Sequence, residues 1–242
     1  MLVRHKKIFS LGALFAATFL VVLLVIFSPI FGNGKNGLEF SDDLFNKLSK
    51  GSSYFIPDVE KGVKPFGGQS FTASVKVGNQ DLAIKMLMAA GAQVGNEEGK
   101  LKVSGDLGKL LTTVLADSDA MYHNRGAEIA ARYTTSGGVD ADASAKKALK
   151  TWWEILNGMA KDFQFQKKIE QANVTDRVLK KGVEPAYNFY GVQAESVASK
   201  ALLMTSLLVF YVLYTMWWGY GIFFMFDGIG LSMKKAKVKK EV

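Results

Sequence analysis

Two long apolar runs frame the chain, and a region of mixed polarity lies between them. Residues 8–31 contain no charged side chain. As a helix this run is about 36 Å long, which is enough to cross the roughly 30 Å hydrocarbon core of a bilayer. The second run, residues 200–226, opens on Lys200 and then stays apolar until Asp227. The pattern therefore predicts two transmembrane helices.

The first run is more consistent with an uncleaved anchor than with a cleaved secretory signal peptide. Basic residues precede it, as they would in either case, but its apolar stretch is longer than the roughly 7–15 residues of a signal-peptide core. The sequence that follows, SPIFGNGKNG, also lacks a small-residue cleavage site. We therefore expect this span to remain in the mature protein.

The region between the spans, residues 32–199, is long enough to form a core of its own. A helix is expected after the glycine-rich linker 32–37, with its N-cap among residues 41–43. Further on, alternation of apolar and polar residues predicts strands, and a spacing of three or four predicts helices. These elements are a strand at 70–77, a helix at 80–90, strands at 92–94 and 100–104, and a helix from 107. Asn79 and Asp106 are the expected helix N-caps.

The second half of this region is predicted to be helical. Gly137-Gly138 is expected to break the chain, and Asp140 or Asp142 is the expected cap of a helix whose apolar residues extend to Phe163. Adjacent helical residues point about 100° apart, so Trp152 and Trp153 are expected to divide between core and surface.

The last part of the region combines a predicted loop with a predicted helix. Residues 182–191 contain Pro185 and three aromatic residues, which favours a loop, and the chain is expected to be helical from Val192 into the second span. The predicted fold class is thus a membrane-anchored α+β (α/β-like) domain. A small β-α-β-β-α lobe is followed by a helical half, and two transmembrane helices flank them.

The net charge of +8 lies mostly at the two ends of the chain. The tail 1–7 carries three basic residues, the tail 227–242 carries five lysines and two acids, and the region between is close to neutral. The positive-inside rule therefore places both tails in the cytoplasm and residues 32–199 in the periplasm or outside the cell. The compact chain favours a bacterial inner (plasma) membrane.

Composition excludes several classes of chemistry. The chain has no cysteine and two histidines, which excludes disulfides, thiolate metal sites, a cysteine nucleophile and a centre with several histidine ligands. The near-neutral central region argues against nucleic-acid binding. No cofactor or metal is expected.

His123 is the one weak candidate for catalysis. It stands in DSDAMYHNRG, where it is a candidate general base with Asp117 or Asp119 as its orienting acid. A surface or structural histidine is the alternative. Asp117 and Asp119, like Asp140 and Asp142, do not match the spacing of a calcium-binding loop and are interpreted as helix caps.

Aromatic residues indicate two candidate partner surfaces. In the second span, Tyr214, Trp217, Trp218, Gly221 and Asp227 are the candidate face for another membrane subunit; an aromatic belt on a tilted helix is the alternative.

Outside the membrane, Trp153, Tyr187 and Tyr190 are the candidate partner surface, with core packing as the alternative for the tryptophan. We therefore expect a non-enzymatic accessory, scaffold or interaction subunit of a membrane complex. Its expected partners are the lipid bilayer and either another membrane protein or a second copy of the chain. The alternatives are an extracytoplasmic ligand-binding or sensory domain that relays to another membrane protein and, third, a membrane-anchored enzyme.

Overall fold

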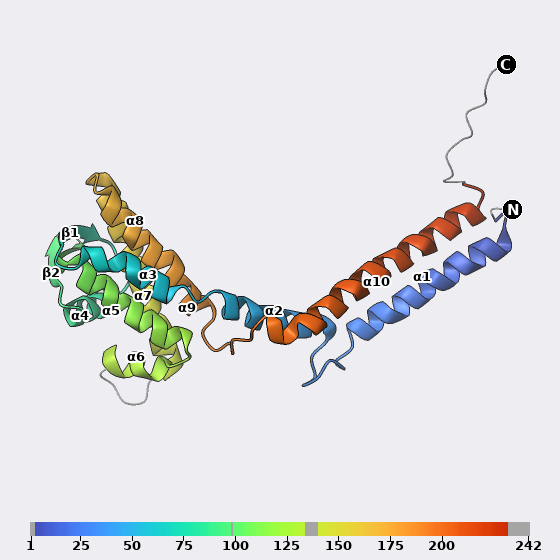
Figure 1. Cartoon of the computed structure of the whole chain (residues 1–242), viewed down its shortest axis with the longest axis horizontal. Coiled ribbons are helices and arrows are strands. Elements are labelled where there is room, and N and C mark those ends of the chain that lie inside the picture. The colour runs from blue at the N-terminus through green and yellow to red at the C-terminus, as the bar shows by residue number, and fades with distance from the viewer. Residues whose placement is uncertain (1–2, 98, 134–139, 232–242) are drawn as a thin grey trace, which may run out of the picture. The chain divides into compact units, whose positions relative to one another are not determined.

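The computed structural model describes residues 3–97, 99–133 and 140–231, and it is mostly helical (71%) with one small sheet (Figure 1). The chain divides into two compact units. We call Met1–Phe45 with Glu195–Val242 the helix-pair unit, and Asn46–Ala194 the domain unit. The lysine-rich end of the predicted basic tail and the Gly137-Gly138 break lie outside the described residues.

The helix-pair unit consists mainly of α1 (Lys6–Ile26) and α10 (Ala201–Gly228), which lie side by side and antiparallel (Figure 1). The backbone N–H groups of Arg4 and His5 donate to the carbonyl of Gly228 at 3.0 and 2.8 Å. This joins the start of α1 to the end of α10. Both helices are long and apolar enough to cross a membrane.

Glycines bring the two helices into close contact. A Cβ on Gly12 would lie 2.6 Å from the Met225 nitrogen and 2.7 Å from the Gly221 oxygen, and a Cβ on Gly228 would lie 2.6 Å from Phe9 Cβ. Small residues permit this approach because the backbones then contact each other directly. Gly219, by contrast, has no such neighbour within 4 Å among the described residues.

The helix after the first span begins earlier than predicted. α2 (Gly37–Ser52) is capped by Asn36, whose Oδ1 accepts from the N–H groups of Leu38 and Glu39, and not by residues 41–43. Glu39 Oε2 in turn accepts from the Asn36 N–H at 2.9 Å. This reciprocal capping box satisfies the free donors of the first turn, so the prediction missed a cap that lies inside the supposed linker.

The β-α-β-β-α lobe of the domain unit is confirmed. Its strands are β1 (Ser70–Val75), β2 (Gln93–Glu97) and β3 (Lys100–Asp106), with α4 (Gln80–Ala89) between the first two. The sheet order is β1-β3-β2 and both pairs are antiparallel. Asn79 accepts from the N–H of Leu82 and Asp106 from that of Lys109, as the predicted caps should.

Further helices of the domain unit pack against the sheet and against one another (Figure 1). They are α3 (Ile56–Val63), the 3₁₀ turn η1 (Lys64–Phe66), α5 (Leu107–Tyr122), α6 (Gly126–Tyr133), α7 (Ala141–Phe165) and α8 (Ile169–Val178). Asp140 caps α7, which selects between the two caps that the sequence offered. Large buried side chains of α5 and α7, such as Leu111, Trp152 and Phe163, lie in the core.

Two predictions near the end of the domain unit are wrong. Residues 182–188 are not a loop, because they continue the π-helical turn η2 (Leu179–Val183) into α9 (Glu184–Asn188), and only residues 189–191 form a turn. Pro185 lies at the junction of η2 and α9, where the regular ladder of hydrogen bonds four residues apart is already interrupted by the π-helical turn.

The second error is the expected helix from Val192. The chain after it is irregular, and helix resumes only at the 3₁₀ turn η3 (Ala198–Lys200). The Val192 carbonyl instead accepts from Lys50 Nζ and Asn124 Nδ2.

Candidate functional site

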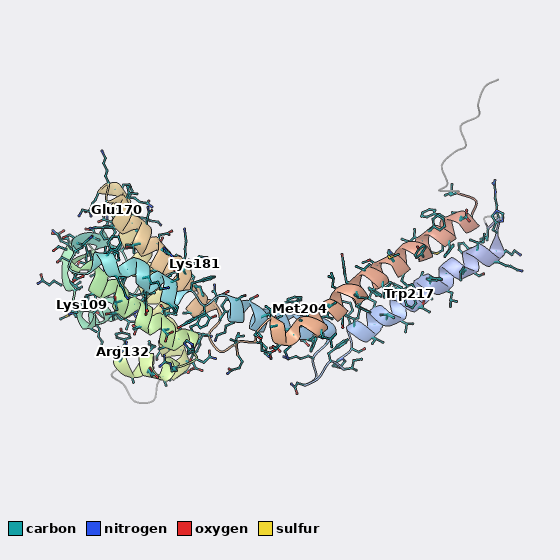
Figure 2. The ribbon with its side chains drawn as sticks, viewed as in Figure 1. Lys109, Arg132, Glu170, Lys181, Met204 and Trp217 are labelled. Atoms are coloured by element: carbon teal, nitrogen blue, oxygen red, sulfur yellow. The ribbon has the colours of Figure 1, made fainter. Side chains whose placement is uncertain are left out.

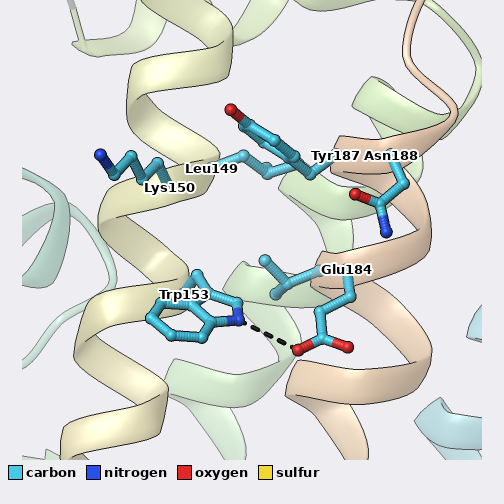
Figure 3. A pocket seen from close by; sticks show the side chains of 7 residues that line it. Leu149, Lys150, Trp153, Glu184, Tyr187 and Asn188 are labelled. Carbon is cyan, nitrogen blue, oxygen red and sulfur yellow. Dashed lines mark hydrogen bonds between the residues drawn. The ribbon is translucent and has the colours of Figure 1, made fainter.

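A groove on the domain unit lies between α7 and the segment that forms η2 and α9. Its volume is about 380 Å³. α7 contributes Leu149, Lys150 and Trp153, and the facing segment contributes Val183, Glu184, Tyr187 and Asn188. Figure 3 shows Trp153 and Glu184 meeting across the groove, while the Lys150 side chain extends away from the facing helix.

The adjacent tryptophans of α7 divide as predicted. Trp152 is fully buried, whereas Trp153 is 39% exposed at the groove. This follows from the 100° step per residue, which allows one of two adjacent helical side chains to fill the core while the next reaches the edge.

The π-helical turn sets the position of Glu184. The Glu184 N–H donates to the carbonyl of Leu179, five residues back, and Gly182 leaves room for Leu115, since a Cβ there would lie 2.8 Å from Leu115 Cδ2. Glu184 Oε1 then accepts from Trp153 Nε1 at 3.0 Å (Figure 3). The indole is thus held in one orientation while its ring remains open to solvent. Single π-helical turns recur at functional sites.

The structure brings together two of the three aromatic residues predicted for the extracytoplasmic surface. Tyr187, 41% exposed, lines the groove with Trp153. Tyr190 lies elsewhere: its hydroxyl donates to Asp142. Burial and this hydrogen bond raise the pKa of Tyr190 to about 12, so at neutral pH the phenol is a donor that fixes local structure.

His123 is the C-cap of α5 and lies beside Asp119, while Asp117 has other partners. Its Nδ1 lies 2.9 Å from the Asp119 carbonyl oxygen and 3.2 Å from Asp119 Oδ1. The same carboxylate accepts from Tyr54 at 2.7 Å and from Arg125 at 3.0 Å. Burial, and then the bond to Asp119, raise the pKa of Tyr54 to about 12. The histidine is therefore one member of an exposed polar cluster, and it is not among the residues that line the groove.

Asp117, interpreted from sequence as a helix cap, is instead a buried acceptor in the middle of α5. It is fully buried, accepts from Tyr133 at 2.6 Å and from Trp152 Nε1 at 2.8 Å, and pairs with Arg132. Arg132 belongs to α6 (labelled in Figure 2). Burial raises the pKa of Asp117, and its hydrogen bonds and the arginine charge act in the opposite direction. The cap interpretation is wrong because the partners lie 15 to 35 residues away.

A buried lysine near the start of the domain unit holds the segment near the end of the same unit. Lys50, 2% exposed in α2, donates to Asn124 Oδ1 at 3.1 Å and to the carbonyls of Phe189 and Val192 at 3.0 and 2.7 Å. The Tyr122 hydroxyl donates to the Lys50 carbonyl. Burial lowers the pKa of Lys50. No pattern in the sequence indicated these contacts, because the residues that make them are 72 to 142 positions apart.

The aromatic residues of α10 that were predicted to form a membrane partner face pack on α1 of the same chain. The Tyr214 ring stacks on Phe19 at 4.1 Å and its hydroxyl donates to the Phe19 carbonyl. Trp217 Nε1 donates to the Phe15 carbonyl at 3.1 Å. Further along α10, Trp218 lies 4.7 Å from the ring of Phe19, Gly221 contacts the backbone of α1, and Asp227 is in the last turn. Contact of these residues with another subunit stays a prediction.

The described residues form no candidate metal centre, and no known protein matches the chain. Within the described part of the chain, no group of three or more histidine, aspartate or glutamate side chains is arranged to hold a metal ion. Comparison with known proteins finds no family model, no curated protein and no solved structure that matches the chain.

Proposed function

We propose that this chain is a two-span membrane protein whose domain unit is a non-enzymatic interaction subunit, accessory or scaffold of a membrane complex. The observation that carries the proposal is the groove of Trp153 and Tyr187, with Glu184 bonded to the indole. In the proposed arrangement the membrane is a bacterial inner membrane. Both tails are cytoplasmic and the domain unit lies on the other side.

The exposed surface of the two long helices supports the membrane part of the proposal. Apolar side chains such as Leu14, Leu24, Leu202 and Leu208 are each more than half exposed on the helix pair. Burying such a surface in hydrocarbon is favourable, whereas leaving it in water is not. The basic residues in both tails support the proposed orientation.

The groove is suited to a protein partner because Trp153 and Tyr187 are exposed and the hydrogen bond to Glu184 already orients Trp153. Tryptophan and tyrosine dominate the energetically important positions of protein interfaces. Covering Trp153 leaves no unpaired donor, because its N–H already bonds to Glu184. Holding the ring before binding also reduces the entropy lost on association.

The test is retention of a partner by the full chain purified from its own membranes in mild detergent. Trp153→Ala should weaken the partner's affinity by about 30-fold, corresponding to about 2 kcal/mol for an interface hot spot. Trp153→Phe, which keeps an aromatic ring but loses the bond to Glu184, should have an intermediate effect. Phe165→Ala is the control, since Phe165 is an aromatic residue of the same helix, 88% exposed, that does not line the groove.

Two results would contradict the proposal. The first is a chain purified at native expression that retains no partner. The second is a partner lost with Phe165→Ala but retained with Trp153→Ala, which would move the surface to the turn between α7 and α8.

The cavity itself favours a second candidate, a ligand-binding or sensory domain. Its volume of about 380 Å³ falls within the roughly 300–1,000 Å³ range of small-molecule sites, and the polar groups of Lys150, Glu184 and Asn188 line it. A small molecule that stabilises the wild-type chain but not Trp153→Ala would favour this function. An enzyme based on His123 would instead lose its activity in His123→Ala.

A further inference from the structure

A second groove, of about 720 Å³, lies wholly within the helix-pair unit. One wall is the end of α1 with the turn that follows, the second is the beginning of α2, and the third is the part of α10 from Met204 to Tyr214 (Figure 2). The aromatic rings of Phe31 and Phe40, whose centroids are 6.2 Å apart, both line it.

The lining of this groove offers hydrocarbon surface and few hydrogen-bonding groups. None of the described residues that line it is charged. Ser41 donates its hydroxyl to the Gly37 carbonyl at 2.8 Å, and Tyr214 donates to the Phe19 carbonyl at 3.1 Å, so neither donor is free for a ligand. An extended peptide needs partners for its own backbone groups, whereas an alkyl chain needs none.

The length and depth of the groove correspond to one leaflet of a bilayer. Met204 and Tyr214 are ten residues apart, which is about 15 Å along a helix and about half of the roughly 30 Å hydrocarbon core. Lys200, one turn before Met204 at the start of α10, pairs with Glu195 at 3.0 Å. Charged groups of this kind mark the interface between lipid headgroups and water.

We infer that the groove binds one acyl chain of a phospholipid from the leaflet on the side of Lys200. The inference rests on the proposed membrane insertion of the two helices, but it does not depend on the protein partner. The groove is continuous with the lipid-facing surface of α10, where Leu208 and Leu213 are 63% and 60% exposed. A bound lipid would fill the space between α2 and α10 within the helix-pair unit.

The experiment measures lipid retention by native mass spectrometry. The full chain is reconstituted in vesicles of phosphatidylethanolamine and phosphatidylglycerol and released in mild detergent. The wild-type chain should retain one phospholipid. Leu208→Trp, which places a large ring in the groove, should lose that lipid, and Leu213→Trp should retain it because Leu213 does not line the groove. Thr205→Phe, at a second lining position, should behave like Leu208→Trp, and far-UV circular dichroism reports whether each variant is folded.

The outcomes separate this inference from the proposed function. A wild-type chain without bound lipid, or equal retention by all variants, would overturn the acyl-chain site. The acyl-chain site would also be overturned if the mass showed a second copy of the chain or another membrane helix in place of the lipid, and if Leu208→Trp lost that partner. Loss of the protein partner in Trp153→Ala concerns the other groove and leaves lipid retention unchanged.

Discussion

Asp117 and Asp119 lie two residues apart on α5, yet their surroundings differ completely. Asp117 is fully buried and accepts hydrogen bonds from two buried residues, Tyr133 and Trp152, whereas the Asp119 side chain is 28% exposed. Asp117→Ala leaves both buried donors without an acceptor, so we expect it to lower the unfolding free energy of the domain unit by about 3 kcal/mol. Urea denaturation of the detergent-solubilised chain, followed by circular dichroism, measures this loss.

Asp119→Ala is the matched control for this prediction. Its partners, Arg125 and Tyr54, can turn to solvent, so the expected loss is about 1 kcal/mol or less. Equal losses for the two variants would contradict the account of Asp117.

The raised pKa of Asp117 adds a test of the same network by pH. Because burial raises its pKa in the folded state, folding takes up a proton between the ordinary carboxyl pKa and the raised one. The stability advantage of the wild-type chain over Asp117→Ala should therefore shrink as the pH rises through this interval. An advantage that grows with pH would contradict the direction of the shift.

At the scale of elements, the glycine contacts of α1 and α10 predict how the helix pair responds to substitution. Gly12→Leu places a side chain where even a Cβ lies 2.6 Å from the backbone of α10. Overpacking of this kind costs about 1–3 kcal/mol, so the melting temperature of the chain in detergent should fall. Gly219→Leu is the control on α10, where no neighbour lies within 4 Å among the described residues, and it should leave the melting temperature unchanged. The reverse order would contradict the observed pairing.

Elements with a local signal could be predicted from the sequence, and elements set by distant contacts could not. Asn79 and Asp106 cap the helices that immediately follow them, so a few residues of sequence were enough. The helix across residues 184–188 was missed because Pro185 suggested a loop, while the π-helical turn before it depends on the packing of Gly182 against Leu115.

The candidate groove likewise combines a feature that the sequence could predict with contacts that it could not. The exposure of Trp153 followed from its position beside Trp152, a relation between neighbours in sequence. Its contact with Glu184 joins residues 31 positions apart, and no spacing in the sequence indicates it. Likewise, the aromatic residues of α10 suggested a partner, but only the structure pairs Tyr214 with Phe19 of α1.

In the whole molecule, the proposed topology requires that the chain cross a membrane twice and expose the domain unit on the side opposite both tails. The chain contains no cysteine, so a single introduced thiol gives an unambiguous signal. Glu170, exposed at the start of α8 (Figure 2), and Lys237, in the basic tail, are suitable positions on the two predicted sides.

The most direct test is therefore the labelling of Glu170→Cys and Lys237→Cys with a membrane-impermeant maleimide. In intact cells, or in spheroplasts if an outer membrane blocks the reagent, Glu170→Cys should react. Lys237→Cys should react only after the inner membrane is permeabilised. Labelling of Lys237→Cys on the outside, protection of Glu170→Cys, or a mature chain that begins after Phe31 would contradict the account.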